Sequence, residues 1–163
     1  MGTNIDCYDR KFQFKHPSSS SMLHDILHHL DPAQRWGHAK LLAHLATADG
    51  RVSRDELAFF EQRLGASLLS PERKEQLREL LLETPELEDC FEGMDGRGIK
   101  LALRDACLMA LADRDINDEE RVRLLNVAKK IGMNEKNVDE LIEWVVKGYH
   151  WMQEGYDLLS IEL

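Results

Sequence analysis

Two short acidic stretches carry the residues of this sequence that are best suited to bind a ligand. Each begins with an aspartate directly after an alanine-rich segment, at Asp49 and Asp113, and each continues with further acids. The candidate ligands are Asp49, Asp55, Glu56, Asp113, Asp115, Glu119 and Glu120. Carboxylate oxygens are the ligands that Ca²⁺ and Mg²⁺ prefer, whereas Zn²⁺ favours nitrogen and sulfur. The pattern indicates a divalent-cation site, with Ca²⁺ or Mg²⁺ favoured over Zn²⁺, or a surface for a basic partner.

The position of each aspartate relative to its helix makes it informative. Asp49 and Asp113 are predicted to close helices, where the last carbonyl groups are unpaired and the helix dipole is negative. A carboxylate there needs a cation or a hydrogen-bond donor. We therefore expect both aspartates to be direct ligands, while the acids that open the following helices bridge or support them. The alternative is that both accept N–H bonds within their own turns and that Arg51 or Arg114 neutralises them.

Neither turn is an EF-hand calcium loop. Asp113, Asp115 and Asn117 fit the first three ligand positions of that motif. However, Asp118 replaces the required glycine, and Leu124 replaces the bidentate glutamate at the twelfth position. The first turn fits less well. The pattern is therefore compatible only with weak binding of a hydrated cation.

The two acidic stretches belong to a longer pattern that occurs twice. A shift of 64 positions aligns residues 46–56 with residues 110–120, so that alanine, aspartate, an apolar residue, a capping residue and two acids recur in the same order. In each copy a Ser or Asn stands three residues before a glutamate, which is the capping-box spacing at the start of a helix. The repeat predicts an internal duplication of a helix, an acidic turn and a second helix.

The elements that position these acids are helices. Apolar residues recur at helical spacing, and no segment shows strand alternation bounded by hairpin turns. Residues 100–112 are apolar on nearly every side, which predicts a helix enclosed by others. We predict an all-α protein in which residues 22–163 form one helical domain of about seven to nine helices, after an N-terminal arm at residues 1–21. A first helix is expected at residues 22–30 and a separate final turn or short helix at residues 151–163.

Composition narrows the classes of partner. The 163 residues carry a formal net charge of −9, which argues against binding nucleic acid, because phosphate contacts require clustered Lys and Arg. Three cysteines without a C-x-x-C pair indicate neither a disulfide framework nor a thiolate zinc site. No apolar run is long enough for a membrane span, and the N-terminal residues lack the apolar stretch of a signal peptide. We expect a cytoplasmic protein that binds a protein partner.

A second chemistry is offered by histidines near the N-terminus. His24 and His28 are four residues apart, a spacing at which two imidazoles on a helix can hold one zinc ion. His24-Asp25 also resembles half of the His-Asp signature of metal-dependent phosphohydrolases. The alternative function is therefore an HD-like phosphohydrolase using His24, Asp25 and His28. A solvated polar helix face explains the same residues without a metal.

Two further features concern packing. Arg104 and Asp105 interrupt the apolar stretch, and we expect them to pair with charges on neighbouring helices, because an unpaired buried charge is costly. Trp144 and Trp151 are interpreted as core anchors. An exposed patch on the last helix that meets a partner is the alternative.

At the repeated residues the sequence resembles the TerB family, the tellurite-resistance protein B group. Residues 48–56 match its A-D-G turn, capping residue and acidic helix start, and residues 112–120 are similar, with Arg114 where glycine is usual. The resemblance covers about residues 36–147 and implies an all-helical fold in which acids of the two halves lie near each other. It implies a role in tellurite resistance or stress response through binding, with metal binding and an adaptor role, and it implies no known catalytic activity.

These observations together predict a non-enzymatic acidic binding or adaptor module of the tellurite-resistance type. The two duplicated turns are its candidate site for a divalent cation. The metal-dependent phosphohydrolase is the alternative.

Overall fold

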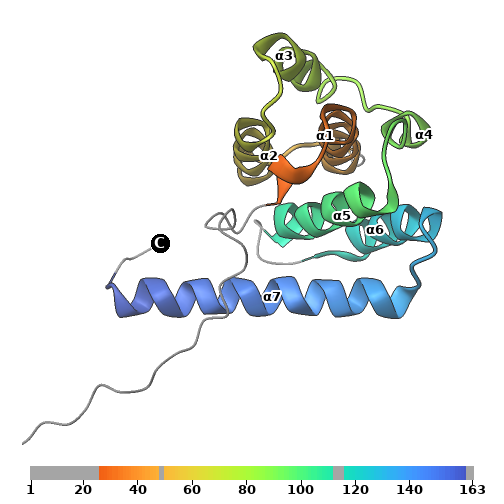
Figure 1. The fold of residues 1–163 in the computed structure, drawn as a ribbon. Coiled ribbons are helices and arrows are strands. Elements are labelled where there is room, and N and C mark those ends of the chain that lie inside the picture. Colours follow the sequence, from red (N-terminus) through yellow and green to blue (C-terminus); the bar gives the residue numbers. More distant parts are fainter. Residues whose placement is uncertain (1–25, 48–49, 112–115, 161–163) are drawn as a thin grey trace, which may run out of the picture.

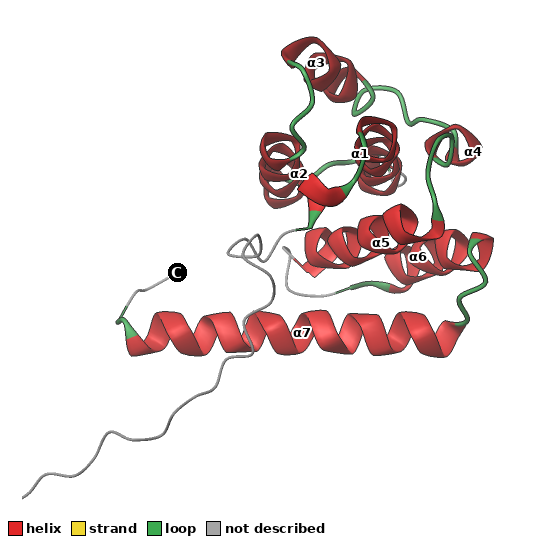
Figure 2. Cartoon of the chain, viewed as in Figure 1, coloured by secondary structure: helices red, strands yellow, loops and turns green. Residues whose placement is uncertain are grey.

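The computed structural model describes residues 26–47, 50–111 and 116–160, and within these ranges the chain forms helices and no strand (Figures 1 and 2). The elements are η1 Leu27–His29, α1 Pro32–Thr47, α2 Arg54–Ala66, α3 Pro71–Glu79, α4 Leu87–Cys90, α5 Gly96–Ala110, α6 Asp118–Lys130 and α7 Glu135–Leu158. The prediction of an all-α fold is confirmed for this part of the chain. None of the described helices combines the length and apolar character that crossing a membrane requires. The predicted arm at residues 1–21 lies outside the described residues.

Helices α1 and α5 form the centre of the protein. They pack most extensively on each other, and α5 also contacts α2, α6 and α7 (Figure 1). Every residue from Gly37 to Ala43 of α1 is buried, as are most residues of α5. The prediction that the apolar stretch at residues 100–112 is enclosed by other helices is therefore confirmed for its described part, residues 100–111.

The helix bounds repeat with the spacing found in the sequence. Helices α1 and α5 begin at residues 32 and 96, and α2 and α6 begin at residues 54 and 118, so both pairs are offset by 64 positions. Helices α2 and α6 each contain 13 residues. Residues 64 positions apart therefore occupy the same place in the pair α1–α2 and in the pair α5–α6.

Glycines terminate elements where the chain adopts a left-handed conformation. Gly50, after α1, has φ +75°, and Gly132, after α6, has φ +72°. At the second site the Met133 N–H donates to the Ala128 carbonyl at 3.0 Å, which closes the helix end in a Schellman arrangement. A residue with a Cβ is strained at such a φ, so glycine sets where these helices stop.

The predicted first helix at residues 22–30 is wrong over its described part. Only the three-residue 3₁₀ helix η1 forms there, and Leu30 is already extended, with ψ 144°. Pro32 disfavours helical geometry at the residue before it, so the chain turns directly into α1. The short turn is sufficient to bury Leu27 and Leu30 against Leu101.

The predicted separate final element at residues 151–163 is also wrong over its described part. Helix α7 is continuous for 24 residues, because no proline or left-handed residue interrupts it before Ser160, which has φ +54°. Its C-terminal half extends past the ends of α5 and α6 (Figure 1). The interpretation of Trp144 and Trp151 as core anchors is therefore wrong, since these side chains are 60% and 70% exposed.

Candidate functional site

The two acidic turns lead into helices that begin in the same way. In α2 the Ser53 hydroxyl accepts the Glu56 N–H at 3.1 Å, and Glu56 Oε2 accepts the Ser53 N–H at 2.8 Å. In α6 the Asn117 side chain accepts the Glu120 N–H at 3.0 Å, and Glu120 Oε2 accepts the Asn117 N–H at 2.9 Å. Both predicted capping boxes are confirmed. Each one orients a glutamate carboxylate back toward the turn that precedes its helix.

The fold brings these two glutamates to one place. Glu56 and Glu120 line the same small hollow of about 20 Å³, which is about the volume needed for a single water molecule. The other residues that line it are Leu45, Ala106, Met109, Ala110, Arg123 and Leu124. The corresponding acids of the two halves thus lie close together over an apolar floor, with one arginine at the same hollow.

The remaining predicted ligands do not join this hollow in the described part of the chain. Asp49, Asp113 and Asp115 lie outside the described residues. Asp55 and Glu119 are exposed in the first turns of α2 and α6, where the helix dipole favours negative charge. Among residues 26–47, 50–111 and 116–160, no group of three or more His, Cys, Asp or Glu side chains is placed to hold a metal ion. Two carboxylates, each with an oxygen bound to its own helix cap, do not complete a Ca²⁺ or Mg²⁺ site.

The alternative histidine site is only partly covered by the structure. His24 and Asp25 lie outside the described residues. His28 belongs to the 3₁₀ helix η1, and its ring centroid lies 4.1 Å from that of His29. Because η1 is not an α-helix, the described part of this segment does not provide the spacing on which the zinc interpretation was based.

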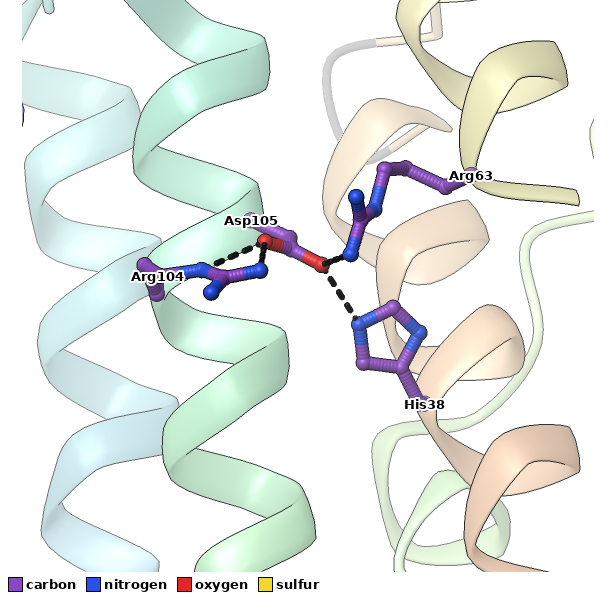
Figure 3. A network of polar contacts seen from close by, with 4 residues as sticks. All are labelled: His38, Arg63, Arg104 and Asp105. Atoms are coloured by element: carbon purple, nitrogen blue, oxygen red, sulfur yellow. Dashed lines mark hydrogen bonds and ion pairs between the residues drawn. The ribbon is translucent and has the colours of Figure 1, made fainter. Parts of the chain in front are cut away.

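A buried carboxylate lies where three helices meet. Asp105 of α5 is fully buried and contacts His38 of α1, Arg63 of α2 and the neighbouring Arg104 (Figure 3). Its Oδ2 lies 2.9 Å from His38 Nε2 and 2.7 Å from Arg63 Nη2, while Oδ1 accepts from Arg104 Nε at 2.8 Å. The prediction that Asp105 pairs with charges on neighbouring helices is confirmed.

The surroundings of Asp105 keep it ionised. Burial raises the pKa of this carboxyl, but the hydrogen bond from His38 and the charges of His38, Arg63 and Arg104 outweigh it, so the pKa lies below its ordinary value. An ionised carboxylate only accepts hydrogen bonds, so His38 Nε2 is the donor. Solvent does not reach this oxygen pair, and the cluster joins α1, α2 and α5.

The described cysteines are likewise unsuited to nucleophilic chemistry. Cys90 and Cys107 are both buried and free. Burial raises the pKa of each thiol to about 12, so both remain protonated near neutral pH. A thiol in that state is a poor nucleophile and a poor metal ligand.

An open apolar groove lies between α1 and the end of α3. It has a volume of about 480 Å³ and is lined by Trp36, Gln76, Glu79, Leu80, Leu82 and Glu83. Leu82 is 87% exposed, and the Arg73 guanidinium carbon lies 5.2 Å from the Trp36 ring centroid. Within the described part of the chain, the carboxylates of Glu79 and Glu83 form no ion pair. The groove thus combines an apolar floor with two carboxylates that have no ion-pair partner among the described residues, and the Arg73 guanidinium lies over its Trp36 ring.

The groove is lined by the first residues of an acidic segment, residues 79–95, that the sequence analysis did not identify. Its seven acids, all exposed, are Glu79, Glu83, Glu86, Glu88, Asp89, Glu92 and Asp95. The segment contains no Lys, Arg or His, so a count of charges along the chain would have found it. Lys130, on α6, pairs with Glu88 at 2.8 Å. A second groove of about 580 Å³ has a mixed lining that includes Lys100 and Glu140, so it shows no preference for one sign of charge.

Comparisons of the chain with protein-family models, with curated proteins and with solved structures give no match. The chemistry of its own surfaces is therefore the basis for assigning a function.

Proposed function

We propose that this chain is a non-catalytic helical binding module that holds a basic, amphipathic segment of a partner protein in the groove at Trp36. The observation that carries the proposal is the meeting of an apolar groove with the carboxylates of Glu79 and Glu83, which pair with no charge in the part of the chain that the structure describes. This extends the acidic adaptor role in tellurite or stress resistance that the TerB resemblance implies, and it places the partner surface on α3 rather than on the acidic turns.

The chemistry of the groove defines the partner. An apolar side chain inserted against Trp36, Leu80 and Leu82 gains about 1.5–3 kcal/mol from full burial. Each Lys or Arg beside it, paired with an exposed glutamate, adds about 0.2–1 kcal/mol. The acidic segment continues the same sign of charge along the surface, which steers a basic partner toward the groove and speeds association.

Peptide binding tests this proposal. Fluorescence anisotropy measures the affinity of the full chain for a labelled amphipathic peptide made of Leu and Lys. The same peptide with Glu in place of Lys is the control ligand. A triple variant of the exposed groove residues, Leu82→Ser with Glu79→Gln and Glu83→Gln, should bind the Lys peptide with an affinity lower by about tenfold or more. Because Leu82 is 87% exposed, the triple variant should keep its fold.

The matched control is Glu86→Gln with Glu92→Gln, which removes two charges from the same acidic segment but not from the groove lining. It should lower affinity by about threefold or less, through long-range electrostatics alone. Equal losses in both variants, or equal binding of the Glu peptide, would contradict a specific groove.

A second candidate function is binding of a divalent cation at the duplicated acidic turns. It is favoured by one observation, the placement of Glu56 and Glu120 at the same hollow. The equal offset of the two helix pairs supports an internal duplication of the TerB type, in which corresponding acids approach each other. Asp49, Asp113 and Asp115 precede these helices in the chain and would complete the ligand set.

Calorimetry separates the cation hypothesis from the phosphohydrolase alternative. On chelator-treated protein, Asp49→Ala with Asp113→Ala should abolish the heat of Ca²⁺ or Mg²⁺ binding, while His24→Ala keeps it. Zn²⁺ or Mn²⁺ binding that depends on His24 and supports phosphoester cleavage would instead favour the hydrolase.

A further inference from the structure

From Trp144 to the C-cap residue Leu159, α7 carries an exposed apolar face that no proposed function uses. Its large side chains, with their exposed fractions, are Trp144 60%, Trp151 70%, Met152 45%, Leu158 87% and Leu159 70%. Residues 144, 151 and 158 recur every seven positions, as do Gly148 and Gly155, so these residues share one side of the helix. The α7 apolar face is defined here as these five side chains with the two glycines.

The two glycines indicate close approach of another backbone. A Cβ added at Gly148 or Gly155 would meet no atom within 4 Å, so the space above both is open. Glycine within a helix costs about 1 kcal/mol relative to alanine. Two glycines seven residues apart, flanked by large apolar side chains, would let a second helix pack at short distance.

This face is complementary to itself. In an antiparallel pair whose twofold axis crosses α7 between residues 151 and 152, Gly148 of one copy faces Gly155 of the other. Trp144 then faces Leu159, so large side chains cover both ends of the glycine contact. A twofold interface requires such self-complementarity, because the same patch supplies both sides.

The charges of this half-helix also suit self-association. Its polar side carries Lys147, His150, Glu154 and Asp157, which nearly balance, although the whole chain has a net charge of −9. In the same antiparallel register Lys147 of one copy comes close to Glu154 of the other, because both residues lie on the same flank of the apolar face. Figure 1 shows α7 on the opposite side of α5 from α3 and α4, so the acidic segment stays away from this contact.

We infer that the α7 apolar face is the interface of a homodimer, formed with the same face of a second copy of this chain. The basis is the combination of exposed aromatic and aliphatic side chains, open glycines and balanced charge in one self-complementary register. The contact is independent of the groove at Trp36, which lies on other helices, so failure of either proposal leaves the other standing.

Sedimentation velocity of the full chain over a range of concentrations tests this inference. The protein should sediment as a dimer, and Trp151→Glu should raise the dimer dissociation constant by about 30-fold or more, the effect of a central interface residue. The matched control is Val122→Glu, which places the same charge at a 53% exposed apolar position on α6 and should leave the dimer intact.

The glycines provide a second readout that a merely exposed helix does not predict. Gly148→Ala with Gly155→Ala should raise the melting temperature of the monomer, because alanine favours the helix and the space is open, yet weaken the dimer. A protein that is monomeric up to about 1 mM, or a dimer unaffected by Trp151→Glu, overturns the inference. Monomer with a blue-shifted tryptophan emission on neutral phosphatidylcholine vesicles would assign the face to lipid and overturn it as well.

Discussion

The helix pair α1–α2 and the helix pair α5–α6 begin at corresponding positions, and α2 and α6 begin with the same capping box. The two pairs differ in what they bury. At the offset of 64 positions, Asp105 of α5 corresponds to Leu41 of α1, and both are fully buried. Two of the bases that pair with Asp105 come from the other half, where His38 and Arg63 occupy the positions that correspond to Ala102 and Val127. One scaffold thus accepts either an apolar side chain or an ionised one. The ion is paired by Arg104 of its own helix and by two residues that the opposite pair supplies.

The largest effect on the free energy of unfolding is expected from disrupting the buried ion cluster at Asp105. Asp105→Asn removes the negative charge and leaves the buried His38 and the partly buried Arg63 without it, so the free energy of unfolding should fall by about 3–5 kcal/mol. Urea unfolding followed by circular dichroism measures the loss. A loss below about 1 kcal/mol would mean that solvent reaches the cluster.

A matched triple variant sharpens the same comparison. Asp105→Leu, His38→Ala and Arg63→Val install the residues found at the corresponding positions of the other half. Replacing a buried ion cluster by apolar residues is often neutral or stabilising by about 1–4 kcal/mol. The triple variant should therefore be at least as stable as the parent in the same urea experiment. Stability as low as that of Asp105→Asn would show that the cluster is required by the shape of this interface.

The next effect compares two helix glycines with different surroundings, Gly37 of α1 and Gly65 of α2. Gly37 of α1 packs against α4, and a Cβ there would meet Met94 Cγ and lie 3.0 Å from the Cys90 carbonyl oxygen. Gly37→Ala should reduce the free energy of unfolding by about 1–3 kcal/mol, because the packed Met94 side chain must move and the Cys90 carbonyl is already in tight contact. In α2, Gly65 has open space above it, so Gly65→Ala should be stabilising by up to about 1 kcal/mol. Thermal unfolding of both variants compares them directly.

A smaller and equal effect is expected at the two helix starts. Ser53→Ala and Asn117→Ala each remove a side-chain cap with the same hydrogen-bond pattern, so each should cost about 1 kcal/mol. Urea unfolding of the single and double variants gives both values and their additivity. Costs that differ by more than about 1 kcal/mol would argue that the two pairs are not equivalent.

The titration of Asp105 has the smallest effect on the free energy of unfolding near neutral pH, because this carboxyl takes up a proton only in acid. Its folded-state pKa lies below its ordinary value near 3.9, so the stability it contributes is complete above that value and is lost as pH falls through the lower folded pKa. Urea unfolding below about pH 4 should therefore show a steeper loss of stability in the parent than in Asp105→Asn. Parallel profiles would indicate that the carboxylate has no depressed pKa.

Residues that interact within one turn of helix could be predicted from the sequence. The caps at Ser53 and Asn117 depend on a neighbour three residues away, and both are confirmed. The end of α7 could not be placed in this way, because nothing in its local sequence distinguishes a continuous helix from two. The exposure of Trp151 depends on where the helix leaves the domain.

The candidate sites divide along the same line. The carboxylates of Glu56 and Glu120 could be assigned to helix starts from their spacing, but their shared hollow results from how α2 and α6 pack around α5. Two partners of Asp105, His38 and Arg63, are 67 and 42 positions away in the chain, so no local pattern identifies them. The groove at Trp36 likewise joins α1 to the end of α3.

The sequence alone determined the all-helical class, the repeated helix starts and the acidic character, because propensity, capping and charge are properties of neighbouring residues. Only the tertiary structure decided which charges are neutralised, which apolar side chains remain exposed and which acids meet. Burial and long-range pairing arise when segments distant in the chain come together, and the energy of each contact depends on both partners.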